Sequence, residues 1–97
     1  MVVEEMMNSD FCMFVEALNE EIPLGTNYKV FNTIDDNYHK VICFYSNPRD
    51  FHPIAILKIG NHGCEFSDEY PNFDSMLASN VLKSFLSNHN ADASLGV

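Results

Sequence analysis

The segment YHKVICFYSNPRDFHPIAILKIGNHGCEF, residues 38–66, contains three short apolar runs separated by two groups of turn-forming residues. The runs are Val41–Tyr45, Ile54–Ile59 and Cys64–Phe66. Short runs rich in β-branched and aromatic residues are typical of strands. The intervening sequences at 47–50 and 60–63 contain the Asn, Pro, Asp and Gly that favour turns. Connections this short leave no room for crossover helices, so we expect antiparallel pairing.

A further strand and an amphipathic helix precede this segment. Residues 28–34 alternate imperfectly and lead into an Asp-Asp-Asn turn at 35–37, as in a β-hairpin. Between residues 3 and 22, apolar side chains recur at three- and four-residue steps, which predicts a helix ended by Pro23. A helix that begins at Ser9 as its N-cap is the alternative.

A second amphipathic helix is predicted from Asp74 onward, with Asp74 or Asn72 as its N-cap. The order is therefore α-β-β-β-β-α. We predict an α+β fold, in which a four-stranded antiparallel meander carries the N-terminal and C-terminal helices on one face. The other face of the sheet is then exposed or forms an interface.

The chain has 97 residues, of which 46% are hydrophobic. This length supports one hydrophobic core rather than two. We predict a single domain at residues 1–89 and a flexible C-terminal tail at residues 90–97, where few side chains can be buried.

The cysteines and the N-terminus point to the cytoplasm. Cys12, Cys43 and Cys64 have no paired spacing, so they do not describe a disulfide framework. We interpret Cys12 and Cys43 as small core residues. The first residues lack the basic start and apolar run of a secretory signal. The longest apolar runs span about five residues, against the roughly 20 that a bilayer-spanning helix needs.

The charge is strongly acidic, with 14 Asp and Glu against 5 Lys and Arg and a net charge of −9. Such a surface repels a phosphate backbone, which argues against direct binding of nucleic acid. The charges are also unevenly placed. Residues 1–28 contain six acids and no Lys or Arg, whereas residues 29–58 contain four of the five cations.

Residues 65–74 interleave four carboxylates with three aromatic side chains and contain no Lys or Arg. We interpret this segment as a docking surface for a basic partner, with Tyr70 as the aromatic anchor. An ordinary solvated loop, with its aromatic residues turned inward, is the alternative. The residues predicted to bind the partner are Glu16, Glu20, Glu65, Asp68, Glu69, Tyr70 and Asp74.

No enzyme motif is apparent. The sequence has no nucleophile motif, no phosphate-binding Gly loop and no carboxylate pair with a predicted apolar pocket. We therefore predict a protein that is not an enzyme and has no cofactor or metal. The alternative is a small metal-binding protein or enzyme that uses His62 and Cys64, with His52 as a remote ligand.

These observations favour a small acidic protein-binding module. The most concrete form is an inhibitor that blocks the basic, nucleic-acid-binding surface of another protein. Its composition is typical of phage or mobile-element inhibitors of the anti-CRISPR, anti-restriction or repair-inhibitor type. An acidic chaperone or an assembly subunit is the alternative. A homodimer through the open sheet face or an edge strand stays open as well, because Met6, Met13 and Met76 fall off the apolar stripes.

Overall fold

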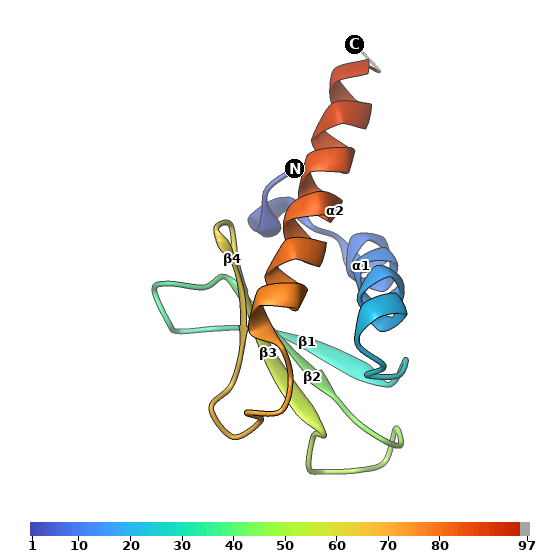
Figure 1. Cartoon of the computed structure of the whole chain (residues 1–97), viewed down its shortest axis with the longest axis vertical. Coiled ribbons are helices and arrows are strands. Elements are labelled where there is room, and N and C mark those ends of the chain that lie inside the picture. The colour runs from blue at the N-terminus through green and yellow to red at the C-terminus, as the bar shows by residue number, and fades with distance from the viewer. Residues whose placement is uncertain (96–97) are drawn as a thin grey trace.

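The computed structural model describes the backbone of residues 1–95 and the side chains of residues 1–88. A short 3-10 helix, two α-helices and a four-stranded sheet make up the fold (Figure 1). In chain order they are η1 (Val3–Glu5), α1 (Asn8–Glu21), β1 (Tyr28–Asn32), β2 (Lys40–Phe44), β3 (Ala55–Gly60), β4 (Gly63–Phe66) and α2 (Ser75–Leu95). The sheet is an antiparallel meander of order β1-β2-β3-β4, so the predicted α+β fold is confirmed.

The strand register divides the sheet into a covered face and an open face. Ile42 pairs with Leu57 on the covered face, and both side chains are fully buried. Cys43 pairs with Ile56 on the other face, where both are half-buried. We call this second face the open face. Its residues are Lys29, Phe31, Val41, Cys43, Tyr45, Ile54, Ile56, Lys58 and Glu65.

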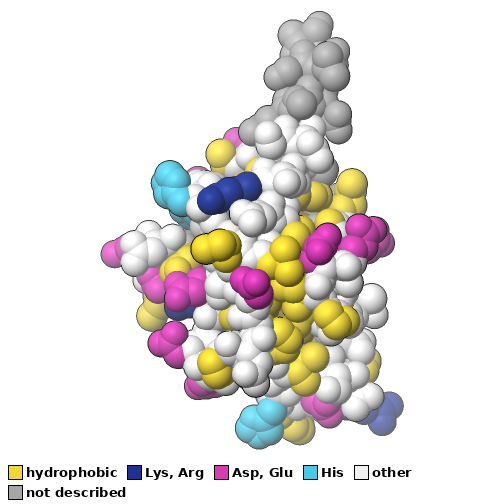
Figure 2. All heavy atoms as spheres, viewed as in Figure 1, with side chains coloured by type: hydrophobic (Ala, Val, Ile, Leu, Met, Phe, Trp, Pro, Cys, Tyr) yellow, Lys and Arg dark blue, Asp and Glu magenta, His cyan; other side chains and the backbone are white. Residues whose placement is uncertain are grey.

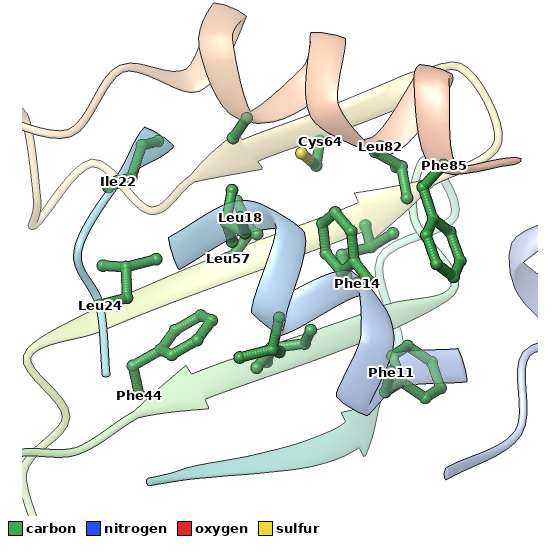
Figure 3. Close-up of a cluster of buried hydrophobic side chains, with 14 of the residues drawn as sticks. Phe11, Phe14, Leu18, Ile22, Leu24, Phe44, Leu57, Cys64, Leu82 and Phe85 are labelled. Atoms are coloured by element: carbon green, nitrogen blue, oxygen red, sulfur yellow. The ribbon is translucent and has the colours of Figure 1, made fainter. Parts of the chain in front are cut away.

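Both helices lie on the covered face and supply half of the core (Figures 1 and 3). Phe14 of α1 and Phe85 of α2 pack against each other with ring centroids 5.9 Å apart. On the sheet below the two helices lie Phe44 of β2 and Leu57 of β3, both fully buried. Burying a side chain of this size contributes about 1.5–3 kcal/mol, so these contacts hold the helices on the sheet.

The N-terminal helix differs from the prediction. The chain breaks at Met6 and Met7, so η1 and α1 are separate, and the continuous helix predicted from residue 3 is wrong. The alternative start at Ser9 is wrong too. The Asp10 carboxylate accepts a hydrogen bond from the Met7 N–H (2.8 Å) and so closes the first turn at Met7. The break turns Met6 into the core, where it is 7% exposed.

Two further side chains correct the sequence interpretation. Cys12 is exposed rather than a core residue, because α1 turns this position away from its buried stripe. Cys43 is only half-buried, because its strand faces the open side of the sheet at this position. The N-cap prediction at Asp74 is confirmed, since its carboxylate accepts the Leu77 N–H (3.0 Å).

The outer edge of β4 is covered by α2. Cys64 and Phe66 direct their backbone groups away from β3. The Ser79 hydroxyl accepts the Cys64 N–H (3.0 Å) and donates to the Cys64 C=O (2.6 Å). The Ser75 hydroxyl accepts the Phe66 N–H (3.0 Å). Serine side chains of α2 therefore take the place of a fifth strand along this edge.

No helix among the described residues has the length and apolar character needed to cross a bilayer. The tail predicted at residues 90–97 falls on positions whose side chains lie outside the described residues, so it stays a prediction.

Candidate partner-binding surface

The acids of α1 lie on the outer side of the helix. Glu16 and Glu20 are exposed, while Phe14 and Leu18 on the opposite side are fully buried. A shallow hollow of about 390 Å³ runs between α1 and α2, and Glu20 contributes to its lining. This placement follows from the helical period, which the sequence shows directly.

Among the described side chains, no Asp or Glu lies within ion-pair distance of a Lys or Arg. The single ion pair joins Glu4 to His39 (3.1 Å), and it forms only when the imidazole is protonated. The carboxylates of α1 and of the loop between β4 and α2 therefore have no Lys or Arg partner among the described side chains.

The lysines have partners of other kinds. Lys29 lies over the Tyr45 ring, 5.3 Å from its centroid, and Lys58 lies over the Tyr38 ring at 5.1 Å. Both are cation–π contacts on the open side of the sheet. These two lysines therefore lie on the opposite side of the sheet from the acids of α1, whereas Glu65 shares the open face with them.

The loop between β4 and α2 carries outward acids and inward aromatic rings. Asp68 and Glu69 are exposed. The Tyr70 hydroxyl donates to the Pro53 C=O (3.1 Å), and the Tyr70 ring lies 6.5 Å from the Phe73 ring. Burial, followed by the Glu69 charge, raises the pKa of Tyr70. The inward aromatic residues of the alternative interpretation are observed, and the use of Tyr70 as an anchor stays a prediction.

Glu65 and Asp74 also have roles within the fold. Asp74 caps α2, as described above. Glu65 lies on the open face, where it accepts the Tyr38 hydroxyl (2.6 Å) and faces Lys58 across the strand pair. The hydrogen bond to Glu65, together with burial, raises the pKa of Tyr38 to about 12. Lys58 is a counter-charge that the sequence alone does not reveal, because it is brought there by the register of β3 and β4.

The seven predicted partner-binding residues do not form one cluster. Glu65 lies on the open face, whereas the α1 acids lie on the helical side. Figure 2 shows that helical side, with its Asp and Glu side chains in several separate patches across the middle and hydrophobic side chains between them. A partner that engages this side meets acidic patches spread over a broad surface.

His62 and Cys64 line a hollow of about 620 Å³ between the β3–β4 turn and the first half of α2. Burial raises the pKa of the Cys64 thiol to about 12, despite the opposing effects of Ser79 and Lys83. A thiol ligand must lose its proton to bind a metal, so this environment disfavours coordination. No group of three or more His, Cys, Asp or Glu side chains within the described part of the chain is arranged to hold a metal ion.

Apart from Glu65, no residue of the open face was among the predicted site residues. Phe31 is 47% exposed there, and Ile54 is 37% exposed. The sequence did contain a signal, since the run at 41–45 is apolar at every position and so places apolar side chains on both faces of the sheet.

Comparison of the chain with models of protein families, with curated proteins and with solved structures finds no match.

Proposed function

We propose that this protein is a binding module that docks on a basic surface of another protein through the exposed acids of α1 and of the β4–α2 loop. The observation that carries the proposal is the absence of any Lys or Arg ion pair to the acids of residues 1–88. Exposed carboxylates that no internal cation neutralises attract a cationic surface and speed its encounter.

The basic surface we favour is one that binds nucleic acid. Such a surface binds closely spaced phosphates, since a duplex carries about one negative charge per 1.7 Å of its axis. A chain with a net charge of −9 in 97 residues offers a competing set of negative charges. Occupation of that surface then inhibits the partner by excluding its nucleic acid.

The test uses two double variants with the same net charge. Asp68→Lys/Glu69→Lys reverses the charges of the β4–α2 loop. Glu5→Lys/Asp36→Lys reverses two other exposed acids that make no side-chain hydrogen bond or ion pair within the described residues. Tagged proteins are used to capture partners from lysate of the native host, and the affinity of the captured protein is measured over a range of salt concentrations.

We expect the loop variant to weaken binding on the order of tenfold and to flatten its salt dependence, while the control variant binds nearly as the native chain does. Duplex DNA or RNA should displace the native chain from its partner. Equal losses in the two variants would show that only total charge matters, and would contradict docking through the loop. A lack of competition would contradict the nucleic-acid-binding surface.

A further inference from the structure

The free edge of β1 presents a regular row of backbone groups. β1 is the first strand in the sheet order, so no strand lies beyond it. Tyr45 donates its N–H to the Asn27 C=O (2.7 Å). Hydrogen-bonded pairs alternate along an antiparallel ladder, so the odd-numbered residues of β1 bond to β2. The residues that direct their N–H and C=O to the free edge are Tyr28, Val30 and Asn32.

Nothing in the described part of the chain covers this edge. No backbone or side-chain hydrogen bond from another element reaches the backbone groups of Tyr28, Val30 or Asn32. The strand pairs with β2 at all five of its residues, without a bulge, and it contains no Pro. A bulge, a Pro and a charged side chain are devices by which proteins prevent pairing at an edge, and of these three β1 has only the charged side chain, Lys29. The β1 edge is therefore competent to accept another strand.

We propose that this edge pairs with β1 of a second copy of the chain, antiparallel and centred on Val30. The two-fold axis then passes between the two Val30 residues, and Tyr28 faces Asn32 of the second copy. These pairs form about six backbone hydrogen bonds. They join the two four-stranded sheets into one continuous sheet.

The side chains of β1 are complementary to themselves in this register. On the open face, Lys29 lies opposite Phe31 of the second copy, so lysine never faces lysine. Phe31 is 47% exposed, which leaves its ring accessible to that ammonium group. The protein already places both Lys29 and Lys58 over aromatic rings on this side of the sheet. The symmetric pairing therefore repeats a contact that the fold uses twice.

No acid of β1 or of its flanking residues opposes pairing at this edge. Residues 22–34 contain no Asp or Glu in a chain whose net charge is −9. The charge of Glu16 on α1 does reach the strand, since it contributes, after burial and Cys12, to the raised pKa of Tyr28. Two copies still repel each other overall, so added salt should strengthen the dimer. Docking on a basic partner should respond to salt in the opposite direction.

The first test changes the backbone of Val30 and keeps the internal ladder. Val30→Pro removes the N–H on the two-fold axis, and it breaks no bond to β2 because that N–H points away. Val30→Ala is the matched control, since it shortens the side chain and keeps the N–H. We expect sedimentation velocity to show a dimer for the native chain and for Val30→Ala, and a monomer for Val30→Pro. Circular dichroism verifies that each variant is folded.

The second test separates side-chain pairing from total charge. Phe31→Glu places a carboxylate opposite Lys29 of the second copy, and Phe31→Lys places an ammonium there. Both variants lose the same ring. We expect the glutamate variant to dimerise about tenfold more tightly, from two cross-strand pairs of opposite sign. Total charge predicts the reverse order, because the glutamate variant is the more acidic one.

The third measurement locates the interface in the native chain. Amide exchange followed by NMR should show that the amides of Tyr28, Val30 and Asn32 become protected as protein concentration rises. The amides of Lys29 and Phe31 bond to β2 and should be protected at every concentration. A native chain that stays monomeric, a dimer that survives Val30→Pro, or protection independent of concentration would overturn the proposal. None of these outcomes bears on the test at Asp68 and Glu69.

Discussion

The two edges of the sheet present the same kind of backbone group in different surroundings. At the β4 edge, the Ser79 hydroxyl bonds to both the N–H and the C=O of Cys64, and the Ser75 hydroxyl accepts the Phe66 N–H. At the β1 edge, no described residue does so. An uncovered strand edge is a template for pairing with another chain, so this difference identifies the edge at which the sheet can grow.

The difference arises from where α2 lies. Eight residues separate the end of β4 from the start of α2, which runs back along that strand and so brings its serines to the strand backbone. α1 instead reaches β1 through a connection closed by Asn19, whose side-chain oxygen accepts the N–H groups of Leu24 and Gly25 (both 2.7 Å). No side chain of α1 hydrogen-bonds to the outward backbone groups of β1 among the described residues.

Gly63→Ala should have the largest effect on the covered edge. Gly63 has a φ of 140°, and an added Cβ would lie 3.0 Å from the Ser79 hydroxyl. The backbone strain costs on the order of 1–3 kcal/mol, and displacement of Ser79 removes hydrogen bonds worth about 1 kcal/mol each. We expect a loss of about 3 kcal/mol in the free energy of unfolding, measured in urea.

Gly25→Ala is the control for that substitution. Gly25 also has a positive φ, 86°, but no atom lies within 4 Å of the added Cβ. Its cost should be the backbone strain alone, about 1–2 kcal/mol. Equal losses at the two positions would mean that contact with α2 contributes nothing at Gly63.

Ser79→Ala should have a smaller effect on the same edge. It leaves the N–H and C=O of Cys64 without their partner, at a cost of about 1–2 kcal/mol, reduced by the better helix propensity of Ala. Amide exchange at Cys64 should accelerate. Ser84→Ala, at an exposed position of the same helix, should instead be neutral or slightly stabilising. Unchanged exchange at Cys64 would contradict the view that Ser79 replaces a strand.

The sequence predicts the sheet and its order because each strand is marked by its own residues. The apolar run at 41–45 and the turn at 47–50 are local signals, and Asp74 caps a helix whose start it marks directly. The bonds of Ser79 to Cys64 depend on how α2 lies along β4, which is set by packing between residues distant in the chain. The spacing of apolar residues along the chain does not predict that placement.

The candidate site likewise divides into features that local sequence determines and features that it does not. Helical period placed Glu16 and Glu20 on an exposed side correctly, because that is a local property of α1. The segment 65–74 looked like one acidic surface, yet Glu65 belongs to a strand and faces Lys58 there. Met6 was expected to lie off the apolar stripe, and the break before α1 turned it inward. The error at Glu65 lies in a contact with a neighbouring strand, and the error at Met6 lies in a helix start that the Asp10 carboxylate sets at Met7.

Tyr38→Phe tests a weaker contact of β4, which joins it to Tyr38 of the β1–β2 loop on the open side of the sheet. The substitution removes the hydrogen bond to Glu65 (2.6 Å). Because the pair is exposed to solvent, we expect a loss of only about 0.5 kcal/mol at neutral pH. The pKa of Tyr38 is raised from 10.0 to about 12. A raised pKa stabilises the folded state below the unfolded value, and that contribution disappears as pH rises from about 10 through about 12.

The native chain should therefore lose its higher free energy of unfolding, relative to Tyr38→Phe, as pH rises through that window. Urea unfolding at each pH measures this difference. Glu65→Gln is the complementary variant, since it keeps an acceptor for the hydroxyl and removes the charge. Titration of the tyrosinate absorbance should then show the pKa of Tyr38 shifted back toward its ordinary value, because the hydrogen bond to the carboxylate is the largest cause of the shift. A constant difference in stability between native and Tyr38→Phe proteins across the window would mean that Glu65 does not hold the proton on Tyr38. Among side-chain hydrogen bonds to β4, only those from the serines of α2 would then contribute to stability.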